Sequence, residues 1–576
     1  MALTHAPSSG STRSSARKRV STALASWWIT LVATVVLLAS AIVPVVYAAV
    51  RSKPLYEDGG TFTLSNYGAF LSDPSFWTAL WNTVQLAVLA AVPSIVIGTS
   101  LAVLVTRTTM PARRLVGVLL LAPLLFPGLG ATLGWVSMYA PRGYVSVWFA
   151  DAFGGVPWDL YSIPGMAIVS LEKTVPLVYL LARARLSTLD SSIEDAALAS
   201  GANPGRVLRT ITLPMMRPSL LMAGVLISMM VFESLGLPLL LGTSADIDTV
   251  STYIYNNWTR AAENQGLVSA TASVLLLIVT LMMLVRRRFE GDSKRFVTTS
   301  GKPKARRPLE LGAFGPLALL ASLGWIALAI VLPTAGLVLT AFTQVFSPLI
   351  SPWEVLTTAH FSTVFDSPTF VRSVRNSVVI AVVGALVATI GLTIAALVAH
   401  RSEFRRRSLL PPLLLFPRAM PGIVVGMGLF WAFVLLDPTG WVRASIWGIM
   451  IAFVIRNTAV GYAAIESTLT SISSELDGAA RTCGAGWWRT SLTIVVPLLQ
   501  PALGACFILM FVALLNDYDP AIFLMTSGNE VIGLTMLRQW LAGFTGPVAA
   551  LGVIQMLITA VVLGAGRYLF GVKARV

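Results

Sequence analysis

Four charged residues interrupt long apolar stretches of this sequence and are its first candidates for chemistry: Lys173, Arg456, Glu233 and Asp517. Ionisable side chains are costly in hydrocarbon, so such residues are functional candidates by default. The two basic residues recur at the same place in two similar halves of the chain, where they could line a path for an anion or a ligand-bound metal. The two acids could meet a cation, line a gate or pair with the basic residues. We therefore take all four as candidates for a translocation path.

Each of these residues also has a purely structural interpretation. Glu172 could neutralise its neighbour Lys173, and either basic side chain could extend to a membrane interface. Arg418 is expected to bind a backbone carbonyl or a lipid phosphate. No nucleophile and base form a recognisable catalytic pattern, and the two cysteines and three histidines lack metal-ligand spacing. We therefore expect no catalytic residues, no metal site and no cofactor bound by this chain.

A polar segment of fixed pattern occurs twice in the chain. Each copy has acidic residues, two alanines, a glycine, an isoleucine and a proline. The first copy contains Glu194, Asp195, Ala196, Ala197, Gly201, Ile211, Leu213 and Pro214, and the second contains Asp477, Gly478, Ala479, Ala480, Gly484, Ile494, Val496 and Pro497. The spacing from glycine to proline is the same in both copies, which indicates an internal duplication.

Both copies have the features of a short helix followed by a turn. Ser191 with Glu194, and Ser474 with Asp477, suit capping boxes at a helix N-terminus. The alanines favour helix, the glycine permits a turn, and the proline marks the return of the chain to apolar sequence. We expect a short surface helix in each copy, and the simplest alternative is an amphipathic connector without a partner.

On these residues the sequence resembles the inner-membrane permease subunits of binding-protein-dependent ABC importers, whose cytoplasmic loop reads E-A-A-x3-G-x9-I-x-L-P. Asp195 takes the glutamate position in the first copy and Gly478 takes it in the second. The resemblance implies two coupling helices that dock on ATPase subunits. The residues implied in these contacts are Glu194, Asp195, Ala196, Ala197, Gly201, Asp477, Ala479, Ala480 and Gly484. It leaves open which acid of each loop dominates.

The resemblance covers the whole chain as a fused double permease, and segments 232–238 and 516–520 are most similar to the ferric-iron type. It implies a permease that translocates ferric iron delivered by an extracytoplasmic binding protein. Phosphonate, thiamine and polyamine import are the alternatives within the family, and a twelve-span secondary transporter is the alternative from another class. The chain has no G-x-x-x-x-G-K-[ST] phosphate loop, so it is not itself an ATPase, and we expect ATP to bind two partner subunits.

The composition predicts an all-α polytopic membrane protein. Hydrophobic residues make up 56% of the chain and charged residues 12%, against roughly 25% charged in soluble domains, and the mean hydropathy is +0.78. The net charge of +15 lies in short clusters between apolar stretches, at 17–19, 113–114, 286–288 and 405–407. This is the pattern of cytoplasmic loops rather than of a nucleic-acid surface.

Apolar stretches predict about twelve spans, at 27–50, 79–106, 115–138, 164–183, 219–242, 267–285, 312–342, 373–399, 409–435, 445–464, 502–526 and 546–566. An even number places both termini on the cytoplasmic side of a bacterial inner membrane. We expect a basic tail at 1–26, a first permease unit at 27–285, a linker at 286–311, a second unit at 312–566 and a tail at 567–576. Six spans in each unit make the two units parallel repeats.

Overall fold

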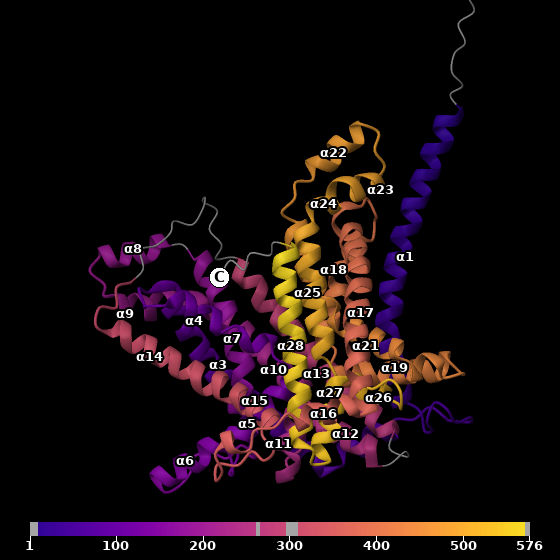
Figure 1. The fold of residues 1–576 in the computed structure, drawn as a ribbon. Helices are drawn as coiled ribbons and strands as arrows, with labels where there is room; N and C mark the ends of the chain where they lie inside the picture. The colour runs from indigo at the N-terminus through magenta and orange to yellow at the C-terminus, as the bar shows by residue number, and fades with distance from the viewer. Residues whose placement is uncertain (1–9, 190, 261–264, 295–308, 571–576) are drawn as a thin grey trace, which may run out of the picture.

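The computed structural model describes residues 10–189, 191–260, 265–294 and 309–570, and their regular secondary structure is helical (Figure 1). Within these ranges, nine helices are long and apolar enough to cross a membrane. The number rises to twelve if each of three sharply bent helix pairs is one span. The all-α, twelve-span prediction is therefore confirmed, while the tail residues 1–9 and 571–576 lie outside the described ranges.

The first half contains the following elements: α1 (Gly10–Ala49), α2 (Ser65–Leu71), α3 (Pro74–Arg107), α4 (Arg113–Leu119), η1 (Ala122–Leu125), α5 (Gly128–Tyr139), α6 (Tyr144–Phe153), α7 (Ile163–Thr188), α8 (Ser191–Ala199), α9 (Pro204–Val207), η2 (Leu208–Thr212), α10 (Leu213–Glu233), α11 (Gly236–Leu241), η3 (Thr243–Ala245), α12 (Val250–Arg260) and α13 (Gln265–Lys294).

The second half follows the same order: α14 (Phe314–Ile326), η5 (Ala327–Val331), α15 (Leu332–Phe342), η6 (Pro352–Glu354), α16 (Ala359–Asp366), α17 (Pro368–Arg401), η7 (Arg407–Leu409), α18 (Leu410–Leu415), η8 (Phe416–Ala419), α19 (Gly422–Leu436), α20 (Trp441–Ala444), α21 (Ile446–Leu469), α22 (Glu475–Thr482), α23 (Trp487–Thr490), η9 (Ser491–Val495), α24 (Val496–Leu498), α25 (Gln500–Asn516), α26 (Ala521–Leu524), α27 (Ile532–Leu541) and α28 (Thr545–Phe570).

Equivalent side chains hold equivalent helices in the two halves. The hydroxyl of Thr83 on α3 accepts a hydrogen bond from the N–H of Val250 at the start of α12, at 2.9 Å. The hydroxyl of Ser377 on α17 accepts one from the N–H of Ile532 at the start of α27, also at 2.9 Å. These hydroxyls satisfy N–H groups that lack an acceptor inside their own helix. These two equivalent hydrogen bonds thus maintain the repeat.

The third span of each half is broken near its middle. The chain bends by 106° between η1 and α5, and by 106° between η8 and α19. Pro127 and Pro421 are the N-cap residues of the second segments. Proline has no N–H to donate and restricts the residue before it, so a helix usually ends there. The second segment of each broken span therefore begins inside the protein rather than at its surface.

The fifth spans end earlier than the sequence predicts. The expected spans 219–242 and 502–526 are wrong at their second ends, because α10 ends at Glu233 and α25 at Asn516. The residues that follow these helices are extended, and the chain then forms the short helices α11 and α26. Hydropathy alone does not register these breaks, since apolar residues continue beyond them. Each break places charged or polar residues inside the bundle.

The two halves exchange their first spans. Helix α1 packs against α13 of its own half and α19 of the other, while α15 packs against α28 and α5. At each crossing a glycine lets the backbones touch: Gly428 on α19 lies against Ala41, and Gly134 on α5 lies against Pro333. Small residues allow this close approach in membrane bundles. Neither half is packed without the first span of the other.

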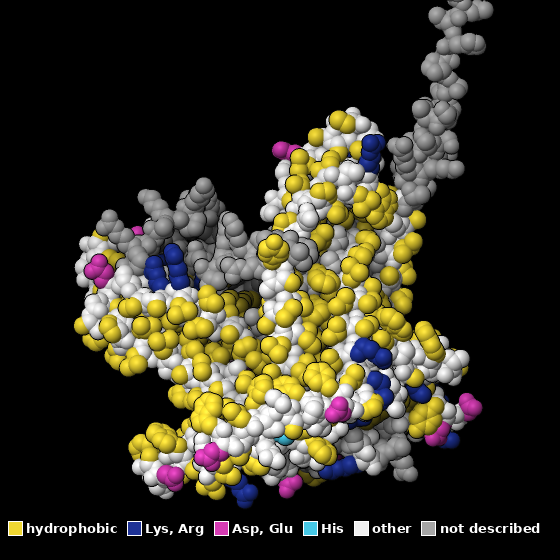
Figure 2. Space-filling model, in the orientation of Figure 1, with side chains coloured by type: hydrophobic (Ala, Val, Ile, Leu, Met, Phe, Trp, Pro, Cys, Tyr) yellow, Lys and Arg dark blue, Asp and Glu magenta, His cyan; other side chains and the backbone are white. Residues whose placement is uncertain are grey.

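The two polar motif helices lie on the same side of the molecule. Helices α8 and α22 both stand at the upper side in Figure 1, and the free ends of α1 and α28 point the same way. Hydrophobic side chains cover most of the helix flanks, and most charged side chains lie toward the two ends (Figure 2). This arrangement agrees with two parallel repeats.

The linker expected at 286–311 begins as a continuation of α13, which extends to Lys294. Residues 295–308 lie outside the described ranges. At its end, the N–H of Leu309 donates to the carbonyl of Arg107 at 2.8 Å, and the N–H of Thr109 donates to the carbonyl of Leu309 at 2.9 Å. The second half is therefore joined to the loop that follows α3.

At the opposite end of the molecule the two halves use different polar contacts. Asp73, at the start of α3, accepts a hydrogen bond from the Tyr253 hydroxyl at 2.7 Å, and Glu530, before α27, accepts two at 3.2 Å from Arg372. Burial raises the pKa of the Glu530 carboxyl, but the hydrogen bond and charge of Arg372 and two backbone hydrogen bonds together outweigh it, so this pKa lies below its usual value. These carboxylates stabilise the outer ends in their charged form.

Candidate functional sites

The two motif copies form the same helix and turn. Gly201 and Gly484 have φ of +86° and +78°, a left-handed conformation that glycine adopts without strain. In the first copy the N–H of Ala202 reaches the carbonyl of Ala197, and in the second the N–H of Ala485 reaches Ala480, both at 3.0 Å. This bond belongs to the Schellman motif, which ends helices by satisfying their last carbonyls.

A π-helical turn follows in each copy. These turns, η2 and η9, come immediately before the helices that begin with Leu213-Pro214 and Val496-Pro497. A proline cannot donate the regular helical hydrogen bond, and wider turns accommodate its ring. The prolines therefore mark the return into the bundle, as the sequence predicts.

The leading acid of each motif is turned inward. Glu194 is 1% exposed, accepts a hydrogen bond from the Thr212 hydroxyl and lies 3.6 Å from Arg107. Asp477 lies 2.8 Å from Arg401. Ser474 makes no side-chain capping bond, so the capping box predicted for the second copy is wrong. These acids fix the motif helices to the bundle.

Arg107 and Arg401 are the partners that sequence reasoning missed. Each is the last residue of a 34-residue helix, α3 or α17. Arg107 also donates to the carbonyl of Leu186 at 2.8 Å, and Arg401 to those of Leu469 at 2.9 Å and Ile472 at 2.5 Å. Arginines at span ends are expected from the positive-inside pattern alone, so that pattern provides no separate reason to assign them an ion pair with the motif acids. Their equivalent positions were the signal that could have found them.

The outward face of both motif helices is smooth and partly apolar. Ile193 is 48% exposed and its equivalent Leu476 is 40% exposed. The other exposed motif residues are Asp195, Ala196, Gly201, Gly478, Ala479 and Gly484, whereas Ala197 is half-buried and Ala480 is buried. The surface that each loop presents is therefore an aliphatic side chain among small residues. The sequence analysis did not single out Ile193 or Leu476.

The candidate path residues of the second half meet in one cavity of about 210 Å³, which we call the Arg456 pocket. Nη1 of Arg456 lies 2.5 Å from Oδ1 of Asp517 and 2.9 Å from Oδ2 of Asp519. Asn457 donates to Asp517 at 2.9 Å. Glu233, from the first half, lies 3.8 Å from Nη2 of Arg456. The pairing expected between the acids and a basic residue is present, and it joins the two halves.

Arg418 lines the Arg456 pocket as a second cation. It lies in η8, just before the break of the third span. Among the described residues no backbone carbonyl accepts a hydrogen bond from it, and the expected alternative, a lipid phosphate, stays a prediction. The charge of Arg418 acts on Glu233, which also faces Arg456. The pocket therefore contains two cations and three carboxylates, Asp519 being the one absent from our sequence prediction.

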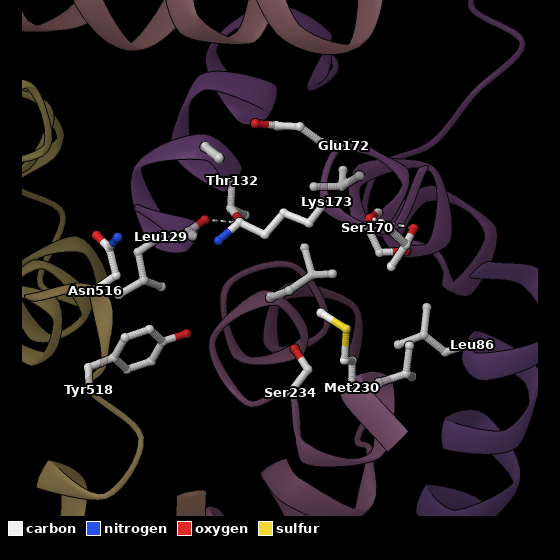
Figure 3. Close-up of a pocket in the computed structure, with 16 residues that line it drawn as sticks. Leu86, Leu129, Thr132, Ser170, Glu172, Lys173, Met230, Ser234, Asn516 and Tyr518 are labelled. Atoms are coloured by element: carbon white, nitrogen blue, oxygen red, sulfur yellow. Dashed lines mark hydrogen bonds between the residues drawn. The ribbon is translucent and has the colours of Figure 1, made fainter. Parts of the chain in front are cut away.

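Lys173 lies in a separate cavity of about 190 Å³, which we call the Lys173 pocket. Its side chain crosses the pocket toward Leu129 and Asn516 (Figure 3). The neighbouring Glu172 accepts a hydrogen bond from Nε1 of Trp135 at 2.6 Å and forms no ion pair with Lys173. Among the described residues, no carboxylate lies within ion-pair distance of the ammonium group. Lys173 is thus not brought together with Glu233 and Asp517.

The two pockets are equivalent in backbone and different in side chains. The ammonium group of Lys173 lies against Gly128 at the start of α5, and Arg456 lies against Gly422 at the start of α19. Where the second half has Asp517 and Asp519, the first has Ser234 and Gly236 at the same distances beyond the motif proline. Glu233 likewise corresponds to Asn516. The acids that neutralise Arg456 have no counterpart beside Lys173.

A cation-binding cluster is not part of these sites. Among the described residues, no group of three or more His, Cys, Asp or Glu side chains is arranged to hold a metal ion. The three carboxylates of the Arg456 pocket instead surround a guanidinium group.

Comparison with known proteins identifies similar sequences over most of the chain. A family model described as "Binding-protein-dependent transport system inner membrane component" matches residues 67–295 and 391–570. The first region contains α8 and the second contains α22. Each match thus lies within one of the two halves described above.

Two relatives match over most of this chain and about three quarters of their own length. A protein of Haemophilus influenzae, named as a candidate ferric transport system permease protein FbpB 1, is 25% identical over 490 residues, which are 83% of this chain and 75% of the relative. The ferric transport system permease protein FbpB of Actinobacillus pleuropneumoniae is 25% identical over 518 residues, 88% of this chain and 73% of the relative. A solved bacterial ABC transporter involved in alginate import is 19% identical, with a TM-score of 0.38, and the match covers 45% of this chain and 96% of that one.

Proposed function

The chain belongs to the family of binding-protein-dependent transport system inner membrane components and is a multi-pass permease of an ABC importer; on this premise we propose that its cargo is ferric iron. A binding protein on the outer side delivers the iron, and two ATPase subunits on the side of α8 and α22 drive its passage. The observation that carries the cargo proposal is the similarity to two ferric permeases along 83% and 88% of the chain.

The motif helices support the ATPase partnership. Both present an exposed aliphatic side chain, Ile193 or Leu476, on a helix locked to the bundle by a buried carboxylate and an arginine. A rigid helix with a small apolar tip suits insertion into a groove of a partner. When the two ATPase subunits approach one another, the helices transmit that movement to the spans through Arg107 and Arg401. The halves then rock about their shared interface.

The cargo is tested by transport in proteoliposomes. The permease is reconstituted with its ATPase and loaded binding protein, and uptake of radioactive iron is measured with and without ATP. We expect uptake that requires both ATP and the binding protein. ATP-dependent uptake of a phosphonate, thiamine or a polyamine without iron uptake would contradict the cargo. Iron uptake independent of ATP would favour a secondary transporter instead.

The ATPase contact is tested separately by co-purification. Replacing Ile193 and Leu476 together with glutamate places charge on both aliphatic tips, and we expect the ATPase to be lost from the purified complex. The matched control is Leu541→Glu, a similarly exposed leucine at the opposite end of the molecule (47% exposed). Retention of the ATPase by the double variant would contradict the docking assignment.

A further inference from the structure

The Lys173 pocket differs from an ordinary buried lysine site because its cation lacks an ion pair. Among the described residues, the acids whose charges act on Lys173 are Glu172 and Asp519. Glu172 is hydrogen bonded to Trp135, and Asp519 is paired with Arg456. A cation within a bundle is normally paired or extended to an interface. Lys173 instead crosses a cavity (Figure 3).

A helix N-terminus adds to the positive character of this pocket. The ammonium group lies beside Gly128, the first residue of the twelve-residue helix α5. No described side chain caps this helix, and its first N–H groups, at Gly128 and Leu129, have no acceptor inside the helix. Such N–H groups and the helix dipole favour an anion at this position.

One acid lines the pocket, Glu172, which is bound to Trp135, and apart from Lys173 the other polar side chains of the lining carry hydroxyl and amide groups. Ser234 and Tyr518 direct their hydroxyls into the pocket, and Asn516 faces the end of Lys173 (Figure 3). The cavity of about 190 Å³ exceeds the roughly 30 Å³ that one water occupies in the liquid. A lysine, free N–H groups and hydroxyls are the donors that bind carboxylate and phosphate oxygens.

We propose that the Lys173 pocket binds an oxyanion, a carboxylate or a phosphate, which arrives either as a ligand of the transported iron or as a free anion. The first source rests on the proposed function, whereas the pocket itself does not. The Arg456 pocket does not suit this role, because Asp517, Asp519 and Glu233 surround Arg456 and outnumber the two cations, Arg456 and Arg418, that line the pocket.

The test uses the full chain in lipid nanodiscs and measures binding of citrate and of inorganic phosphate by calorimetry, in chloride buffer. We expect the wild-type protein to bind at least one of them. Lys173→Met removes the cation, and Ser234→Asp installs the acid found at the equivalent position of the other half. Each should weaken binding by about tenfold or more, because hydrogen bonds to charged groups are the strong ones. Arg538→Gln, which removes an exposed charge from α27, should leave binding unchanged.

Two results would overturn the proposal: no binding of either anion by the wild-type protein, or equal binding by Lys173→Met and Ser234→Asp. The second result would mean an adventitious ion only. Ser234→Asp keeps Lys173 in place, so its thermal midpoint shows whether the variant is folded. Tighter binding of ferric citrate than of citrate identifies the iron ligand as the source, and equal binding identifies the free anion. Since the assay needs neither iron uptake nor ATP, it can succeed where the cargo proposal fails.

Discussion

The Lys173 pocket and the Arg456 pocket occupy equivalent places in two halves of one backbone, yet their charges differ. Arg456 is surrounded by three carboxylates, whereas Lys173 has Ser234 and Gly236 where two of those acids would be. The motif loops, in contrast, are alike in the two halves, because each has an inward acid paired with an arginine. The halves therefore use the same kind of ion pair beside α8 and α22 and different chemistry inside the bundle.

The largest expected effect separates the two pockets by stability. Arg456→Met removes the cation with which three carboxylates form ion pairs, and we expect it to destabilise the fold by about 3–5 kcal/mol, as for other broken buried ion pairs. Lys173→Met removes a cation that has no ion pair, so its thermal midpoint in detergent should stay the same or rise. Thermal unfolding of both variants in one detergent checks this. Equal losses would remove the distinction between the pockets.

The next effect compares the two anchoring arginines. Arg401 lies closer to its acid than Arg107 does, at 2.8 Å against 3.6 Å. We expect Arg401→Ala to lower the free energy of local opening of α22 by about 3 kcal/mol. For Arg107→Ala we expect the free energy of local opening of α8 to fall by about 1–2 kcal/mol. Hydrogen exchange of the two motif helices measures each opening locally. Faster exchange of α8 in Arg107→Ala than of α22 in Arg401→Ala would contradict this order.

A smaller effect should be equal in both halves. Gly201→Ala and Gly484→Ala each force a side chain into a left-handed conformation, which costs about 1–2 kcal/mol. Hydrogen exchange should show α8 and α22 shortened to a similar degree. The matched control is Gly478→Ala, inside α22 with open space around it, which should strengthen the helix by roughly 0.5–1 kcal/mol. Unequal losses would show that the two turns are not equivalent.

The smallest effect concerns the outer ends of the halves. The pKa of Glu530 is lowered in the folded protein, so its contribution to stability is present above its unfolded value and is lost as pH falls through the lowered one. We expect well below 2 kcal/mol, since Arg372 is partly exposed. Thermal midpoints at pH 6 and pH 3.5 should differ less for Glu530→Gln than for the wild-type protein. The same difference in both proteins would show that the contact of Glu530 with Arg372 does not contribute to stability.

Much of the fold follows from hydropathy and repetition, because a bilayer requires about twenty apolar residues per helix. Hydropathy does not locate the ends of the fifth spans. Leu237 and Ile522 continue the apolar pattern after the helices have ended at Glu233 and Asn516, since the break depends on backbone conformation rather than polarity. The same breaks place Glu233 and Asp517 beside Arg456.

The candidate sites were predictable as residues but not as contacts. The sequence identifies Glu194 and Asp477 as belonging to the motif, yet it gives no direction for their side chains. Their inward orientation depends on Arg107 and Arg401, which arrive from helices far away in the chain. The contact of these loops with an ATPase remains a prediction, and Ile193 and Leu476 now join its candidate residues.

The exchange of first spans has a consequence for how the two halves could diverge. Because α1 completes the second half and α15 completes the first, two separate polypeptides would have to find each other and pack before either was whole. Joining them in one chain makes that encounter intramolecular, at a high effective concentration. It also guarantees one copy of each half in every molecule. A symmetric pair of identical chains would carry two identical pockets, whereas fusion allows the cation of one pocket to be paired with acids and the cation of the other to remain open to an anion.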